Sequence, residues 1–200
     1  MIDSRKLICL GGLLLLGCDP SNSQQSDSIP MPKASPIGTT SNTESSSLPA
    51  GEATERRIGG VKFKIPADWE EKALSNTMIH GEYSLPGEAG AARLTLSTTG
   101  GGTEANMVRW KGQFRRSPSD PEPVESRITV AGKEVTLLEL YGTHTEMFGG
   151  GAPKSNWQLL GAAIPIDSDK NYFVKLTGPR ETVTARHDEF LNVIKSARFD

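Results

Sequence analysis

Two histidine–glutamate pairs are the residues of this chain best suited to binding a metal ion. His80 and Glu82 stand two positions apart in one predicted strand, and His144 and Glu146 have the same spacing in another. Side chains two apart in a strand share a face, so each pair could offer one nitrogen and one oxygen ligand to zinc or copper. Nothing in the spacing requires a metal, and two solvated strand faces are the simpler interpretation. We therefore assign no metal ligand and no cofactor from the sequence.

Other polar candidates also have a structural explanation. Residues 100–103, Gly-Gly-Gly-Thr, precede a predicted helix and could present backbone N–H groups to an anion. They lack the Lys-Ser/Thr of a P-loop, so we interpret them as a connector. His187 falls on the apolar side of the last predicted helix, where we expect a half-buried, hydrogen-bonded histidine. No Gly-x-Ser-x-Gly or Ser-x-x-Lys motif occurs, so we assign no catalytic residue and do not predict an enzyme.

A contact surface for a partner is predicted at two places. Arg109 and Trp110 belong to a basic, aromatic stretch of a predicted helix, and Met147 and Phe148 precede the glycines at 149–151. Exposed apolar side chains on a loop are typical of binding surfaces. The alternatives are that Trp110 turns toward the sheet and that Met147 and Phe148 pack in the core.

The first 17 residues have the pattern of an export signal. Arg5 and Lys6 precede an apolar run at 7–16, as in the n-region and h-region of secretory signals. A helix that crosses a bilayer needs about 20 apolar residues, so this run is too short to be a transmembrane anchor.

The end of the signal, Leu-Leu-Gly-Cys at residues 15–18, resembles the lipobox of bacterial lipoproteins. The resemblance implies cleavage between Gly17 and Cys18 and attachment of diacylglycerol and palmitate-type chains to Cys18. Each buried lipid CH₂ contributes about 0.8 kcal/mol, so two or three chains anchor a protein stably. In enteric bacteria Asp19 would imply retention at the inner membrane, and the choice between inner and outer membrane stays open.

Residues 18–55 are predicted to be a lipidated cysteine followed by a disordered tether. The segment is rich in Ser, Pro and Thr and contains no aromatic residue, so it cannot bury enough apolar surface to fold. About 37 flexible residues span about 30–36 Å on average. Because Cys9 leaves with the signal and Cys18 carries lipid, residues 56–200 contain no thiol.

Residues 56–200 are predicted to form one domain. The chain carries a net charge of −2, and loss of the signal, in which Arg5 and Lys6 outweigh Asp3, leaves about −3. So small a negative charge argues against a nucleic-acid partner and against electrostatic adhesion to anionic lipid.

Periodicity predicts an α+β domain: a central, mostly antiparallel sheet of six to seven strands flanked by two helices. One helix begins at Thr103, which we expect to cap it, and the other runs from Pro179 to Ile194. Residues 197–199 are expected to lie as an extended tail on the core. The predicted strands are 61–65, 78–85, 92–97, 127–130, 134–143, 157–166 and 172–177.

The two ends of the domain resemble the PsbP-like superfamily. Residues 60–69, GVKFKIPADW, match its entry of an aromatic strand, a proline and a tryptophan, and residues 190–199, FLNVIKSARF, match its last helix and ending. The resemblance implies an α/β/α sandwich and a role in binding rather than catalysis, because the best-known members are accessory proteins. It does not name a partner.

The sequence therefore favours a membrane-anchored lipoprotein of the cell envelope whose domain is a non-catalytic binding or accessory module for an envelope protein. Two alternatives stay open: a carrier or sensor of a small ligand or metal, and an enzyme of unrecognised class.

Overall fold

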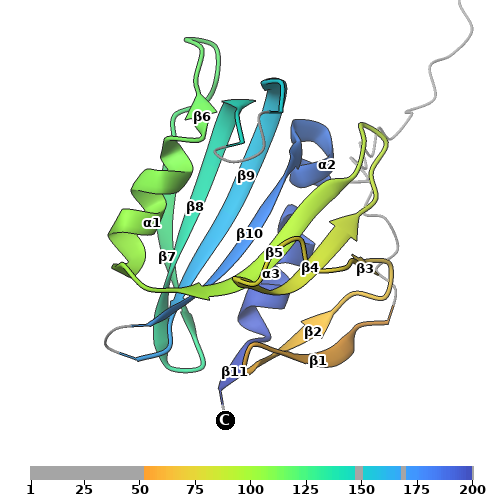
Figure 1. The fold of residues 1–200 in the computed structure, drawn as a ribbon, viewed down its shortest axis with the longest axis vertical. Coiled ribbons are helices and arrows are strands. Elements are labelled where there is room, and N and C mark those ends of the chain that lie inside the picture. The colour runs from red at the N-terminus through yellow and green to blue at the C-terminus, as the bar shows by residue number, and fades with distance from the viewer. Residues whose placement is uncertain (1–51, 147–150, 168–169, 200) are drawn as a thin grey trace, which may run out of the picture. The chain divides into compact units, whose positions relative to one another are not determined.

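The computed structural model describes residues 52–146, 151–167 and 170–199 of the chain. The export signal, Gly17, Cys18, Asp19 and most of the predicted tether, together with Met147 and Phe148, lie outside the described residues. The structure is α+β, with a large antiparallel sheet and, in the described part, three helices (Figure 1). The fold class predicted from the sequence is confirmed.

The large sheet has eight strands, all paired antiparallel, in the order β3-β4-β5-β10-β9-β8-β6, with β7 also paired to β8. Each predicted strand from residue 78 to residue 177 is present in it. The sheet also has two short strands, β3 and β6, that the periodicity did not indicate. The strands are β3 (Glu70–Glu71), β4 (Ile79–Leu85), β5 (Ala92–Thr99), β6 (Phe114–Arg115), β7 (Val124–Val130), β8 (Lys133–His144), β9 (Lys154–Pro165) and β10 (Asn171–Pro179).

A second, three-stranded sheet joins the two ends of the domain. β1 (Thr54–Ile58) pairs with β2 (Val61–Ile65), and β2 pairs with β11 (Arg198–Phe199). The predicted extended tail at 197–199 is thus an edge strand. The strand predicted at 61–65 belongs to this small sheet rather than to the central one. Thr54 and Glu55, which the sequence assigned to the tether, are already part of β1.

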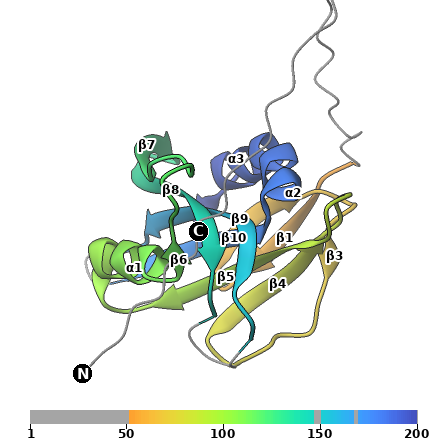
Figure 2. The ribbon, with the colours of Figure 1, turned by 90° about the horizontal axis from the view of Figure 1, so that it is seen from above.

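The helices lie on opposite faces of the large sheet (Figures 1 and 2). α1 (Gly102–Lys111) packs on one face, and α2 (Arg180–Ala185) and α3 (His187–Lys195) pack on the other. The small sheet shares the core of the α2–α3 side. There the hydroxyl of Tyr172 donates a hydrogen bond to the carbonyl of Ile58 at 2.9 Å, which fixes β10 to β1.

Two helix predictions are wrong in detail. Thr103 does not cap α1: the N-cap is Gly101, with φ of 100°, and the Thr103 hydroxyl donates instead to Asn171 Oδ1 at 3.3 Å. The helix predicted from Pro179 to Ile194 is interrupted at Arg186, which has φ −94° and ψ 5° and separates α2 from α3. The side chain of Arg186 is only 3% exposed, and its buried ion pairs hold the backbone at this break.

The position of α1 depends on one glycine. The indole of Trp110 lies directly over Gly161 of β9 and meets the ring of Phe173 edge-on at 5.8 Å. A methyl group at Gly161 would lie 2.3 Å from Cζ3 of Trp110. The helix therefore approaches the sheet closely only because residue 161 has no side chain. The buried residues on this side are Met107, Trp110, Leu138, Leu140, Leu159, Ala163 and Phe173.

We expect Gly161→Ala to lower the free energy of unfolding by about 1–3 kcal/mol, because the added methyl overpacks the contact with Trp110. Urea unfolding measures the change. Gly100→Ala is the matched control: nothing lies within 4 Å of that position, so its effect should stay within about 0.5 kcal/mol. Equal stability of Gly161→Ala and the wild type would show that α1 does not depend on this contact.

Candidate functional site

One face of the large sheet is only partly covered. α1 packs over β8 and β9, whereas the residues of β5 that point to the same side, such as Thr95 and Ser97, remain partly exposed. Figure 2 shows α1 at one side of this face and β4 and β5 at the other. This arrangement leaves a cleft between the helix and the β4 edge.

The cleft has a volume of about 260 Å³ and a mixed lining. Arg109 of α1 and Lys175 of β10 provide two cations. Trp110, Phe173 and Ile79 provide apolar surface, and Met78, which is 64% exposed, lies at the rim. Neutral polar side chains complete the lining: Asn76, Thr95, Ser97, Thr99, Asn106 and Gln113.

Lys175 is the central charged group of the cleft. It is half-buried, pairs across the sheet with Thr95, and donates a hydrogen bond from Nζ to Oε1 of Gln113 at 2.6 Å. Burial, together with the nearby positive charges of Arg93 and Arg109 and against an opposing effect of Glu146, lowers the pKa of its ammonium from 10.5 to about 8. The fold thus holds an amine where its charged form is disfavoured.

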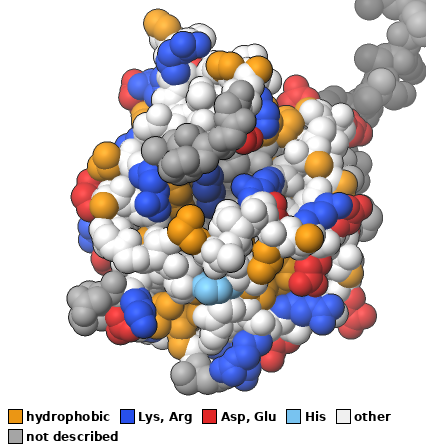
Figure 3. Space-filling view, viewed as in Figure 1, with side chains coloured by type: hydrophobic (Ala, Val, Ile, Leu, Met, Phe, Trp, Pro, Cys, Tyr) orange, Lys and Arg blue, Asp and Glu red, His pale blue; other side chains and the backbone are white. Residues whose placement is uncertain are grey.

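Further cations surround the cleft. Arg93 of β5 binds Glu82 of β4 at 2.7 Å and donates to the hydroxyl of Ser75 at 2.8 Å. Lys154 of β9 binds Glu146 at 3.0 Å and lies 4.6 Å from the ring centre of Trp157. We call Arg93, Arg109, Lys154 and Lys175 the basic face, and Figure 3 shows Lys and Arg side chains gathered around the middle of this side of the molecule.

The pair His80 and Glu82 does not share a face, and that prediction is wrong. A β-bulge between Ile79 and Gly81 inserts one residue into β4, so His80 and Glu82 point to opposite sides. His80 contacts the hydroxyl of Thr98 at 2.6 Å and stacks on Tyr172, whereas Glu82 pairs with Arg93. The hydrogen bond from Arg93 is the largest cause that lowers the pKa of Glu82.

The second pair is also divided between different surroundings. The ring of His144 is buried between Phe114 and Trp157, stacked on the latter at 5.3 Å, while Glu146 is exposed and bound to Lys154. Burial lowers the pKa of His144 to about 4, so this imidazole is neutral at pH 7. Within the described residues, no three His, Cys, Asp or Glu side chains come together as a metal site would require.

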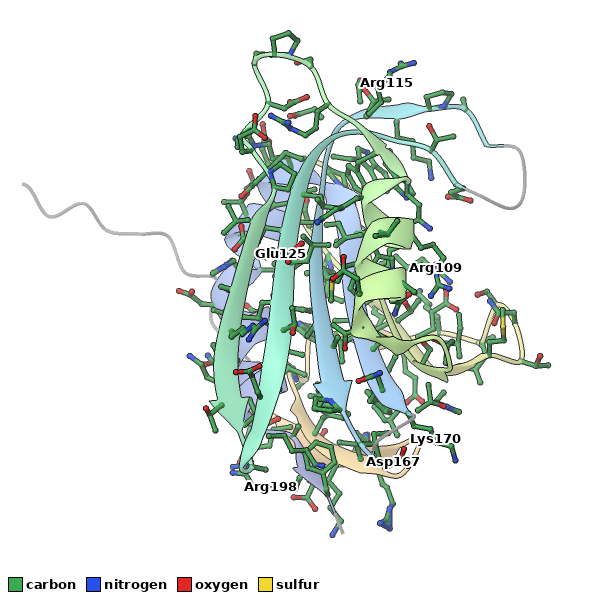
Figure 4. All side chains as sticks on the ribbon, turned by 90° about the vertical axis from the view of Figure 1, so that its left-hand side faces the viewer. Arg109, Arg115, Glu125, Asp167, Lys170 and Arg198 are labelled. Carbon is green, nitrogen blue, oxygen red and sulfur yellow. The ribbon has the colours of Figure 1, made fainter. Side chains whose placement is uncertain are left out.

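The structure also shows where the other candidate residues from the sequence, His187, Trp110 and Arg109, lie. His187 is half-buried and hydrogen-bonds Glu139 at 3.1 Å and Asp188 at 3.2 Å, as expected. Trp110 is 4% exposed and turned toward the sheet. Arg109 is exposed, lines the cleft, and hydrogen-bonds Asn106. Figure 4 shows Arg109 on the side of α1 away from β7, the strand that carries Glu125.

The two segments whose sequences resemble those of PsbP-like proteins, residues 60–69 and 190–199, have packing roles. Asp68 binds the buried guanidinium of Arg186 at 2.6 Å, and the indole N–H of Trp69 donates to Glu189 at 3.1 Å. At the other end, the Ser196 hydroxyl accepts the backbone N–H of Lys64 at 2.9 Å. These contacts connect the start of the domain to its last helix.

Sequence reasoning missed Lys175 and its partner Gln113. The available signal was a lone charged residue in the otherwise uncharged stretch NYFVKLTGP at 171–179. A lysine in such a strand has an ammonium that burial destabilises unless a partner or ligand compensates it.

Comparison with solved structures supports the PsbP-like fold. The cyanobacterial PsbP protein CyanoP from Synechocystis matches with a TM-score of 0.50 and 11% identity over 75% of this chain and 94% of CyanoP. A protein of unknown function from Pseudomonas aeruginosa matches with a TM-score of 0.40 and 16% identity, over 73% of this chain and 96% of that protein. LpqN of Mycobacterium tuberculosis, which is involved in cell envelope biogenesis, matches with a TM-score of 0.42 and 16% identity, over 72% of this chain and 82% of LpqN.

At 11% identity, the match to CyanoP establishes a shared fold and nothing more. No known family profile and no curated protein sequence matches the chain. In the part of the chain that the structure describes, no helix has the length and apolarity needed to span a membrane.

We expect Lys175→Met to raise the free energy of unfolding at pH 7 by about 1–3 kcal/mol, because it removes a buried ammonium whose pKa is depressed. Between about pH 8 and 10.5 the unfolded chain binds more protons than the folded chain. The wild type therefore gains stability as the pH rises, and the advantage of the variant should shrink.

Urea unfolding of both proteins from pH 7 to pH 10 tests this expectation. Lys154→Met is the control, because that lysine is in a partly exposed ion pair and should change stability by less than about 1 kcal/mol at each pH. A Lys175→Met protein less stable than the wild type at pH 7 would contradict the argument.

Proposed function

We propose that the chain is an exported lipoprotein anchored by lipid on Cys18, and that its PsbP-like domain is a non-catalytic accessory module that binds a protein of the cell envelope. The anchor is supported by the signal pattern at residues 1–17 and the lipobox that ends at Cys18. With this anchor and its tether, the domain would work within a few tens of ångströms of the membrane.

The observation that carries the binding role is the basic face. One side of the sheet is closed by α2, α3 and the small sheet, whereas the other side presents four cations close to two carboxylates, Glu82 and Glu146. The chain as a whole is negative, with a net charge of −2, so this local excess of positive charge is a distinct feature of the surface. A partner with an acidic patch would complement it.

The assignment as an accessory module rests on the fold and on the roles of the motif residues. Asp68 and Trp69 make structural contacts with Arg186 and Glu189. CyanoP has the same fold, and LpqN, a weaker match, is involved in cell envelope biogenesis. We propose an envelope role for this chain on the basis of its own lipobox rather than of these neighbours.

The lipid anchor is tested by metabolic labelling with an alkyne fatty acid in a bacterial host. The wild type should incorporate label and remain in the membrane after a carbonate wash, because the thiol of Cys18 is the acceptor. Cys18→Ser should lose the label, and Cys9→Ser, a change within the signal, should keep it. Labelling of Cys18→Ser equal to that of the wild type would refute the assignment.

Binding through the basic face is tested by crosslinking in native membranes, followed by mass spectrometry of the captured proteins. The double charge reversal Arg109→Glu/Lys154→Glu should reduce capture of one envelope protein about tenfold or more, because like charges that face each other cost several kcal/mol. Lys64→Glu/Lys195→Glu changes two exposed lysines outside the basic face and should leave capture unchanged. Equal capture by both double variants would exclude the basic face as the contact.

A further inference from the structure

Among the described residues, no carboxylate forms an ion pair with the ammonium of Lys175 in the cleft. Gln113, a neutral amide, is the hydrogen-bond acceptor found for Nζ of Lys175 among the described residues. An ammonium has three N–H donors, so two of them can bind a ligand. A half-buried amine with a neutral partner pays the cost of burial without a compensating ion pair.

Arg109, at the other wall of the cleft, also has a neutral hydrogen-bond partner. The partner found for its guanidinium in the described part of the chain is Asn106, again a neutral amide. Other cations of the domain do have carboxylate partners: Arg93 pairs with Glu82, and Lys154 pairs with Glu146. Among the four cations of the basic face, the two that line the cleft are therefore those whose partners are neutral amides.

The rest of the lining is apolar in part. Trp110 and Phe173 are buried aromatic residues that show part of their surface to the cleft, and Ile79 adds an aliphatic contact. Ligand sites in proteins have volumes of about 300–1,000 Å³ and combine apolar walls with a few polar groups. At about 260 Å³ the cleft is slightly smaller than that range, which suits a ligand about the size of one aromatic side chain.

We propose that the cleft binds a small organic carboxylate with a compact apolar body. The carboxylate accepts hydrogen bonds from Lys175 and Arg109, and the apolar body lies against Trp110 and Phe173. A monoanion fits better than a dianion such as phosphate, because Glu146 is close enough to act on the charge of Lys175 and repels additional negative charge. The site goes beyond the proposed protein partner and does not depend on it.

The test uses the full-length chain in lipid nanodiscs and phenylacetate as the probe, followed through the indole N–H of Trp110 in ¹H–¹⁵N NMR spectra. Phenylacetate should shift this signal in a saturable way. 2-Phenylethanol, which has a similar size and no charge, and inorganic phosphate should each bind at least tenfold more weakly. If 2-phenylethanol binds as tightly as phenylacetate, the cleft is merely an apolar pocket. If inorganic phosphate binds as tightly as phenylacetate, the cleft is a general anion site. Either result overturns the proposal.

Two variants make the test specific. Lys175→Met should weaken phenylacetate binding at least tenfold, and Arg109→Gln should do the same without changing the interior of the domain. Lys64→Met, which removes an exposed lysine outside the basic face and the cleft lining, should retain binding within twofold. The proposal fails if Lys64→Met loses as much affinity as Lys175→Met, or if phenylacetate produces no saturable shift. It can fail while the crosslinked envelope partner is still found, so the two proposals are judged separately.

Discussion

The contact between Trp110 and the bare backbone of Gly161 determines the shape of the open side of the sheet. It lets α1 approach β9 closely, and the helix in turn brings Arg109 and the following Gln113 to the side of the cleft. Gln113 then meets Lys175. If the helix lay farther from the sheet, the ammonium would be solvated and the cleft would become a flat surface. The electrostatic character of the basic face thus depends on an uncharged packing contact.

Much of the fold could be predicted from local patterns. Period-two alternation located the long strands, and the apolar face of the last helical segment was evident from Val183, Phe190 and Ile194, all of which are buried. The small sheet was not predicted, because its pairing joins β2 to β11, more than 130 residues later in the chain. A local pattern carries no information about such a distant partner.

The site could not be predicted for a related reason. The bulge at Ile79–Gly81 rotates His80 away from Glu82. The residue types near position 80 do not indicate a β-bulge. Arg186 looks like an ordinary helical residue in the sequence, yet its burial with Asp68 and Glu189 ends one helix and begins the next. Lys175 gave the best local signal, a lone charge in an uncharged strand. Its meaning appears only when α1 and the β4 edge enclose it, because burial and the missing counterion come from tertiary neighbours.

The two polar centres of the domain also differ in what they do for stability. Around Arg186 the positive charge is compensated by two carboxylates, and the carbonyl of Pro86 accepts further hydrogen bonds. Removal of any partner would strand a buried charge, so this centre preserves the fold. Around Lys175 the compensation is incomplete, and we expect this lysine to lower the stability of the folded domain. Sites that bind ligands or partners commonly cost stability. This contrast is why we propose the binding role for the Lys175 side of the sheet and a structural role for the Arg186 side.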